Sequence, residues 1–211
     1  KGRMMSKTKK VLGLLSLVVS FVAVMAFIIL SQPSFGGKIS GERLTRVQAN
    51  PQYQEGGFVN VEPQAPFNFS EAGSFLTESF FYDEIRIPPS SLPVLTVTAS
   101  SLKTSPTPIL KAFWIGHAGV YVEIDGIRLL IDPVFSDYAS PFDIGPERFY
   151  PPPIVLQDLP KIDMVLISHD HYDHLDMKTI MHLAKQGTHF FVPLGIGAHL
   201  ERWEVPENQI R

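Results

Sequence analysis

The stretch MVLISHDHYDH, residues 164–174, decides the fold of this chain. Residues 164–168 form an apolar run rich in branched side chains, which predicts a short buried strand. A hexad that contains three histidines and Asp173 follows directly, at the carboxyl end of that strand, where open α/β sheets place their chemistry. Because imidazole and carboxylate together suit a cation such as zinc, the sequence predicts a metal site at this strand end.

The spacing of the side chains within the hexad provides for two ions. His169 and His171 are two residues apart, so both can point the same way and hold one ion. Asp173 and His174 lie one turn further on and could hold a second ion beside the first. Two ions about 3.5–4 Å apart can share a hydroxide and stabilise both the attacking and the leaving oxygen of a displacement.

The hexad fits the pattern H-x-H-x-D-H and resembles the signature of the metallo-β-lactamase superfamily. Five further motifs occur in a fixed order around it: WIGHA at 114–118, LIDPVFS at 130–136, residues 139–141, GPERF at 145–149 and FVPLG at 191–195. In that order they resemble the N-terminal half of the N-acylphosphatidylethanolamine-hydrolysing phospholipases D and their bacterial relatives. The resemblance covers about residues 111–211.

This resemblance implies an α/β fold, the αββα sandwich of the metallo-β-lactamases, with residues 111–211 as its first half. It implies two zinc ions, with His169 and His171 binding the first and Asp173 and His174 the second. Asp173 would also be catalytic, by orienting the nucleophile. Neutral imidazoles leave each ion net positive, so bound water becomes available as hydroxide near neutral pH. That hydroxide would attack a phosphorus or carbonyl centre.

Two residues outside the hexad are candidates for supporting roles. Asp132 closes an apolar segment before Pro133, and the resemblance implies an aspartate beside the metals here. We therefore expect Asp132 to accept a hydrogen bond from the ring N–H of a ligating histidine. His117 is either a loop residue that lines the site or a structural histidine. The remaining histidines are expected to be structural or solvated; they are His182, His189 and His199.

The resemblance ends after the first of the family's two similar halves. The family's other ligands, a further histidine, an aspartate that bridges both metals and a last histidine, would follow Arg211. We therefore expect this chain to be an incomplete part of a longer protein and to be inactive alone. If the chain ended at Arg211, a non-catalytic, anchored metal-binding protein would be the alternative.

Val11–Leu30 is a run of twenty residues without a charge. About 20 apolar residues in a helix cross a hydrocarbon core of roughly 30 Å. Residues 1–10 carry five basic side chains and no acid, so the N-terminus should stay cytoplasmic and the rest of the chain should lie on the far side. A single-pass membrane anchor is the favoured interpretation. The alternative is a cleaved signal peptide, with residues 34–36 as an imperfect cleavage site.

Residues 31–110 are rich in proline, glycine, serine and aromatic residues, which indicates an extended arm. The arm either lies across the catalytic domain or spaces it from the bilayer. Its aromatic residues are too numerous for a purely solvated linker; they are Phe67, Phe69, Phe75, Phe80, Phe81 and Tyr82.

Regular structure is expected from Lys111 onward. Strands are predicted at 111–115, 120–124, 128–131 and 189–193, in addition to the strand before the hexad. Asp176 should cap a helix whose apolar face contains Met177, Ile180, Met181 and Ala184. A second helix is expected around Ile196 and Leu200, and the loop at 132–159 is long enough to be functional.

The composition of the chain excludes some classes of binding partner and metal ligand. The formal net charge is −3, and basic residues gather only in the first ten positions, so nucleic acid is not expected as a partner. The chain has no cysteine, which excludes thiolate metal ligands and disulfides. The sequence leaves the oligomeric state open.

These observations together predict a membrane-anchored, zinc-dependent hydrolase. The resemblance implies a phosphodiesterase of the phospholipase D type that acts on a phospholipid or a small phosphodiester. A lactonase of the same superfamily, acting on an ester, is the alternative. The loop at 135–159 and the second half of the domain would decide between these substrates.

Overall fold

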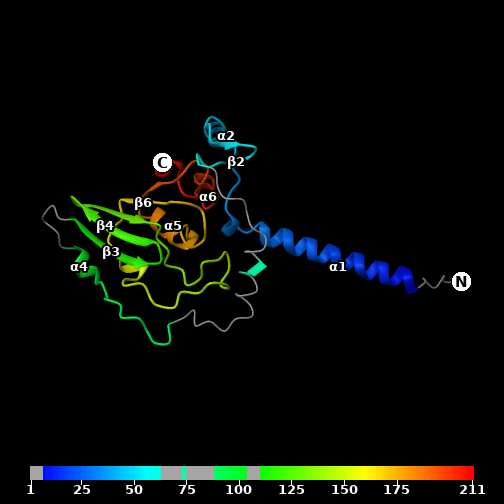
Figure 1. The fold of residues 1–211 in the computed structure, drawn as a ribbon, viewed down its shortest axis with the longest axis horizontal. Coiled ribbons are helices and arrows are strands. Elements are labelled where there is room, and N and C mark those ends of the chain that lie inside the picture. Colours follow the sequence, from blue (N-terminus) through cyan, green and yellow to red (C-terminus); the bar gives the residue numbers. More distant parts are fainter. Residues whose placement is uncertain (1–6, 63–72, 75–87, 104–109) are drawn as a thin grey trace.

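The computed structural model describes residues 7–62, 73–74, 88–103 and 110–211 (Figure 1). The six aromatic residues expected to pack along the arm lie outside these ranges. The described part of the chain consists of a mixed α/β unit and a long N-terminal helix that points away from it (Figure 1).

The α/β unit is built on a five-stranded sheet. The first three strands pair antiparallel and the last two pair parallel, in the order in which they occur along the chain. They are β3 (Lys111–Gly116), β4 (Gly119–Ile124), β5 (Ile127–Ile131), β6 (Met164–Leu166) and β7 (His189–Phe191). This confirms a mixed α/β architecture consistent with the metallo-β-lactamase fold. β6 ends two residues earlier than predicted, so Ile167 and Ser168 belong to the loop that follows it.

The turn between β4 and β5 has the backbone conformation expected of an Asp-Gly hairpin turn. Asp125 and Gly126 both have positive φ, 50° and 80°, which is the backbone geometry that an Asp-Gly hairpin supplies. The resulting register places Tyr121 opposite Leu130, and both side chains are fully buried. Val165 and Phe190 continue this core across the parallel strands.

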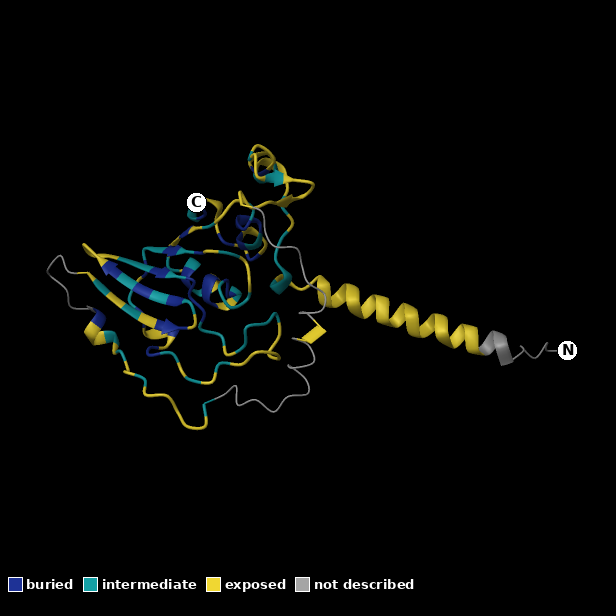
Figure 2. Ribbon diagram, in the orientation of Figure 1, coloured by how far each residue is buried: buried dark blue, intermediate teal, exposed yellow. Residues whose placement is uncertain are grey.

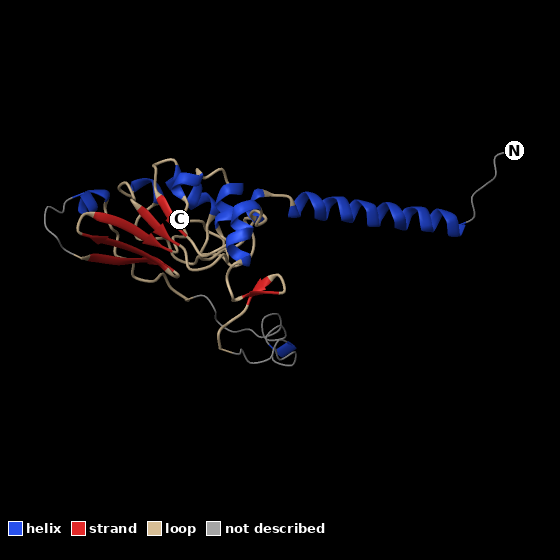
Figure 3. Cartoon of the chain, turned by 90° about the horizontal axis from the view of Figure 1, so that it is seen from above, coloured by secondary structure: helices blue, strands red, loops and turns tan. Residues whose placement is uncertain are grey.

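Two helices follow the parallel strands: α5 (Met177–Ala184) and α6 (Gly197–Arg202). Figure 3 shows helices gathered on one side of the sheet. Asp176 caps α5, since its Oδ1 accepts a hydrogen bond from Lys178 N at 3.1 Å. The predicted apolar face of α5 is wrong in one position: Met181 is exposed, and Leu183 is fully buried in its place. The packing of the helix against the sheet therefore selects a slightly rotated face.

The N-terminal helix α1 (Lys7–Leu30) contains the predicted apolar segment. Val11–Leu30 has a mean hydropathy of 2.8, and none of its most apolar window is buried (Figure 2). By length and composition this helix could cross a membrane. Membrane crossing and its direction stay predictions.

The expected arm at 31–110 is less extended than its composition suggests. Its described part contains a one-turn helix η1 (Pro33–Phe35), the helix α2 (Gly41–Gln48), a small hairpin of β1 (Tyr53–Gln54) and β2 (Gly57–Phe58), and α4 (Ala99–Lys103). Residues 41–48 lack proline and contain several good helix formers, which explains α2. Val47 of this helix is fully buried, and Arg43 Nε lies 2.6 Å from Glu201 Oε1 of α6.

Candidate metal centre

The hexad lies in the loop between β6 and α5, at the carboxyl end of the sheet's parallel strands. His171 O accepts hydrogen bonds from His174 N at 3.0 Å and from Leu175 N at 2.8 Å. These two bonds close a tight turn, so the second half of the hexad folds back beside the first. The predicted metal-binding residues are therefore held on one short loop.

Asp132 connects this loop to the neighbouring strand. It follows β5, and its backbone N donates to Leu166 O at 2.9 Å, which extends the parallel pairing of β5 and β6 by one step. Its buried carboxylate accepts from Ser168 N at 2.7 Å and from Ser168 Oγ at 2.6 Å. His174 Nδ1 lies 3.0 Å from Asp132 Oδ2. The aspartate thus joins the two sides of the loop.

The environment of Asp132 keeps the carboxyl ionised. Burial by itself raises its pKa, but the hydrogen bonds from Ser168 Oγ, His174 and Ser168 N, together with the attraction to His174, outweigh that effect, so the pKa lies below its usual value. An ionised carboxylate can only accept, so it favours a proton on His174 Nδ1, and a neutral His174 would then present the lone pair of Nε2 to the site. This is the arrangement that a neutral, metal-binding imidazole requires.

Within the described residues, one group of three side chains brings its ligand atoms within 4.8 Å of one another: His117, Asp173 and His174. His117 Nε2 lies 2.8 Å from Asp173 Oδ2, and His174 Nε2 lies 3.7 Å from the same oxygen. The structure therefore brings together two of the four predicted ligands, and it places His117, whose role the sequence left open, directly against them.

An unusual backbone turn after β3 positions His117. Both Gly116 and His117 have positive φ, 117° and 48°. The turn is held by Trp114 Nε1, which donates to His117 O at 2.6 Å, and by the Tyr150 hydroxyl, which accepts from His117 N at 3.3 Å. Sequence reasoning did not identify Trp114 or Tyr150 as supports for the site. The contact with Tyr150 has no local signal in the sequence, because Tyr150 lies 33 residues from His117, whereas Trp114 lies three residues from it.

His169 and His171 lie beside this group. The ring centroids of His169 and His171 are 4.6 Å apart, and those of His169 and His174 are 4.0 Å apart. Neither residue belongs to a group of three potential ligands with all atoms within 4.8 Å, as far as the described chain extends. The donor set as a whole, imidazoles with a carboxylate and no thiolate, fits a zinc ion.

The remaining histidines lie outside the cluster. His182 is 3.1 Å from the side-chain amide of Gln186, and His189 is exposed at the start of β7. His199 Nδ1 accepts a hydrogen bond from Gly37 N at 3.0 Å, and its Nε2 lies 3.4 Å from Asp170 Oδ2. His199 therefore connects the segment after α1 to the hexad.

A cavity of about 700 Å³ opens next to the cluster, with His117 and Asp173 in its wall. Much of the remaining wall is aromatic, formed by Trp114, Phe149 and Tyr150. Arg148 contributes a permanent positive charge, and its guanidinium donates to Val134 O at 2.7 Å. The cavity can accept an apolar group and an anionic group close to the candidate ligands.

Comparisons with known proteins agree with these features. Residues 127–211 match a family model described as a beta-lactamase superfamily domain. The chain is 40% identical over 167 residues to an uncharacterised protein of Mycobacterium tuberculosis, which covers 77% of this chain and 44% of that protein. It is 44% identical over 118 residues to the N-acyl-phosphatidylethanolamine-hydrolyzing phospholipase D 1 of Caenorhabditis elegans, with 54% and 31% covered.

A third similarity is to a metal-dependent hydrolase of Caldivirga maquilingensis, 42% identical over 62 residues, which cover 29% of this chain and 22% of that protein. The chain spans less than half the length of each of these relatives.

Proposed function

We propose that this chain carries the first half of a membrane-anchored, zinc-dependent phosphodiesterase of the N-acylphosphatidylethanolamine phospholipase D type. The match of residues 127–211 to a beta-lactamase superfamily domain and the similarity to a phospholipase D of that type support this proposal. The observation that carries the proposal is the cluster of hexad side chains around the buried carboxylate of Asp132. A solvated turn would not need a buried, ionised aspartate to fix the orientation of one of its histidines.

In this proposal His169 and His171 bind one zinc ion and Asp173 and His174 bind the other. When bound, the ions supply an activated water at neutral pH and stabilise negative charge on the substrate's oxygens. Asp132 holds the His174 ring in the required tautomer through the 3.0 Å contact at Nδ1.

Asp173 is the proposed catalytic residue. Its Oδ2 lies 2.8 Å from His117 Nε2 and 3.7 Å from His174 Nε2. With one carboxylate oxygen binding zinc, the other could accept a hydrogen bond from a water molecule and orient it. His117 is proposed to hold the Asp173 carboxylate in place. The positive φ of His117 fixes the position of its backbone, and so restricts where its ring can lie.

The cavity beside the cluster supports a phosphodiester with an apolar portion. Arg148 is the only permanently cationic side chain in the described wall, which also contains the carboxylates of Asp137 and Glu147, and a guanidinium suits a phosphate oxygen. The aromatic side chains of the wall suit an acyl chain. An anchor in the bilayer would concentrate such a substrate. The five basic residues before Val11 support an extracytoplasmic position for the catalytic domain.

The test is a substrate comparison with the complete protein that contains this chain. N-acylphosphatidylethanolamine and a bis-aryl phosphate should be hydrolysed, and a lactone should not. His174→Ala should abolish the activity, whereas His189→Ala, which removes an exposed histidine outside the site, should leave it unchanged. Hydrolysis of the lactone alone would refute the phosphodiesterase proposal and favour a lactonase.

A further inference from the structure

Residues 140–145, here called the 140s loop, expose two large apolar side chains. Ile144 is 67% exposed, and Phe142 is 37% exposed. They lie within the long connection between β5 and β6, which also reaches the candidate site. Two exposed apolar side chains close together on one loop make it a candidate contact surface.

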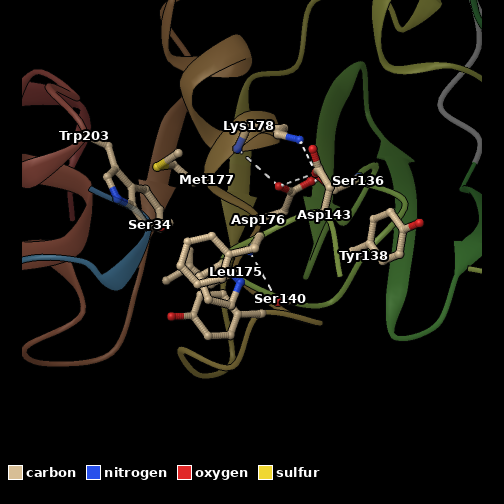
Figure 4. A pocket seen from close by; sticks show the side chains of 13 residues that line it. Ser34, Ser136, Tyr138, Ser140, Asp143, Leu175, Asp176, Met177, Lys178 and Trp203 are labelled. Atoms are coloured by element: carbon tan, nitrogen blue, oxygen red, sulfur yellow. Dashed lines mark hydrogen bonds and ion pairs between the residues drawn. The ribbon is translucent and has the colours of Figure 1, made fainter. Parts of the chain in front are cut away.

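The 140s loop lies beside the segment that leaves α1. The rings of Phe142 and Phe35 pack edge to face with centroids 5.9 Å apart. Ser34 shares the lining of a small pocket with Tyr138, Ser140 and Asp143, and Figure 4 shows these side chains around it. The end of α1 and the loop are therefore neighbours although more than a hundred residues separate them in sequence.

The segment after α1 is fixed to the α/β unit and is not a free tether. Trp203 Nε1 donates to Pro33 O at 2.7 Å, Arg202 donates to Ser31 O at 3.3 Å, and Gly37 N donates to His199 at 3.0 Å. These three bonds come from α6 or its C-cap residue. The direction in which α1 leaves the unit is thus set by the contacts of residues 31–37 with α6 and Trp203.

The distance along the chain from the apolar helix to Phe35 is short. Gln32 N donates to Ile29 O and Phe35 N donates to Gln32 O, both at 3.1 Å, so this segment is turned and not extended. At about 2 Å of rise per residue in such turns, the five residues after Leu30 advance about 10 Å. The polar headgroup layer on each side of a bilayer is roughly 5–8 Å thick. Phe35, and Phe142 against it, therefore lie close to the membrane surface when α1 spans it.

We propose that the 140s loop is a membrane-contacting loop, whose Phe142 and Ile144 side chains enter the headgroup layer of the bilayer that α1 crosses. This inference rests on the proposed function in one respect, that α1 is a membrane anchor. The charge at the loop tip is balanced, since Asp143 Oδ1 lies 3.1 Å from Lys178 Nζ. Insertion therefore depends on apolar burial and not on anionic lipids.

The position of this loop also links the bilayer to the site. Ala139, Pro146 and Glu147, on either side of the 140s loop, line the 700 Å³ cavity together with His117 and Asp173. A lipid that leaves the bilayer at the loop meets the cavity mouth without crossing bulk water. Membrane contact at this loop would thus orient the site toward its substrate.

This chain contains no cysteine, and with any cysteine elsewhere in the complete protein replaced by serine, single labels give a direct test. Three single substitutions, Ile144→Cys, Ile127→Cys and Val22→Cys, are each labelled with a nitroxide in the complete protein, reconstituted in phosphatidylcholine vesicles. Ile127 is a matched control, because it is a 45% exposed isoleucine next to the β4–β5 turn, at the end of the sheet away from α1 (Figure 1). Val22 reports on α1 itself. The measurement is collision of each label with oxygen, which enters lipid, and with a water-soluble nickel complex.

The proposal predicts an oxygen-to-nickel collision ratio at position 144 several-fold above that at position 127, and a still higher ratio at position 22. A low ratio at 144 with a high ratio at 22 would overturn the membrane contact while leaving the anchor intact. Low collision with both reagents at 144 would mean that another part of the protein covers the loop, which also overturns the proposal. A low ratio at position 22 would refute the anchor and with it this inference.

Discussion

Asp132→Asn is expected to weaken zinc binding without removing any predicted ligand. The carboxylate of Asp132 accepts three hydrogen bonds, two from Ser168 and one from His174 Nδ1. An amide can keep the bond from Ser168 N, but its NH₂ group then faces His174 Nδ1. His174 must present a lone pair there, which moves its proton to Nε2 and blocks the ligand position.

The size of the effect follows from this change of tautomer. Loss of such an outer hydrogen bond typically lowers metal affinity by about 10–100-fold, or about 1.4–2.8 kcal/mol. Asp132 is only 4% exposed, so solvent does not screen the loss. The folded state without metal should also lose about 1–3 kcal/mol, because a buried, charge-assisted bond disappears. A zinc titration against a competing chelator and urea unfolding measure the two quantities.

Asp163→Asn is the matched control. It makes the same change at a carboxylate outside the site, whose Oδ2 accepts from Arg128 N at 2.9 Å. Its zinc affinity should therefore change much less than that of Asp132→Asn, although its stability should also fall. If Asp132→Asn bound zinc as tightly as the unchanged protein, the tautomer argument would be wrong.

Three further predictions concern the fold. Ile180→Ala empties a fully buried position of α5 and should cost about 2–5 kcal/mol in urea unfolding, whereas Met181→Ala, on the exposed side, should cost much less; equal losses would refute the assigned face. Burial, and then the hydrogen bond to Glu123, raise the pKa of Tyr121. Above a pH of about 10 the unfolded chain releases the proton of the Tyr121 hydroxyl, whereas the folded chain keeps it. The free energy of unfolding is therefore retained below that pH and falls above it. In Tyr121→Phe the free energy of unfolding should fall less at alkaline pH, which unfolding measured at several pH values would show. Gly37→Ala places a methyl group against a backbone carbonyl of α6, so it should increase protease cleavage near residues 31–37.

Local signals were sufficient for the sheet and for the candidate ligands. The alternation of apolar residues and the Asp125–Gly126 turn predicted the three antiparallel strands, because hairpins are specified by near neighbours. The hexad identified its own four candidate residues from spacing. The role of Asp132 was predicted from the family resemblance, and the structure supplies the physical reason: β5 ends at Ile131, and parallel strands bring their carboxyl ends together.

The features that sequence reasoning missed depend on contacts between distant segments. His117 reaches Asp173 only because two residues with positive φ turn the chain after β3, and Tyr150 accepts from its backbone N. Met181 and Leu183 exchange their expected environments because the helix is oriented by the sheet beneath it. The packing of residues 33–47 against α6 depends on contacts such as Trp203 to Pro33, 170 residues apart.

The central claim is that the hexad and Asp132 form part of a zinc site that performs hydrolysis. The most direct measurement is the metal content of the complete protein, determined together with phosphodiester hydrolysis before and after treatment with a chelator. The account predicts two zinc ions per chain, loss of hydrolysis when they are removed, and recovery when zinc is returned. A protein that hydrolyses the phosphodiester equally well with no bound metal would contradict the account.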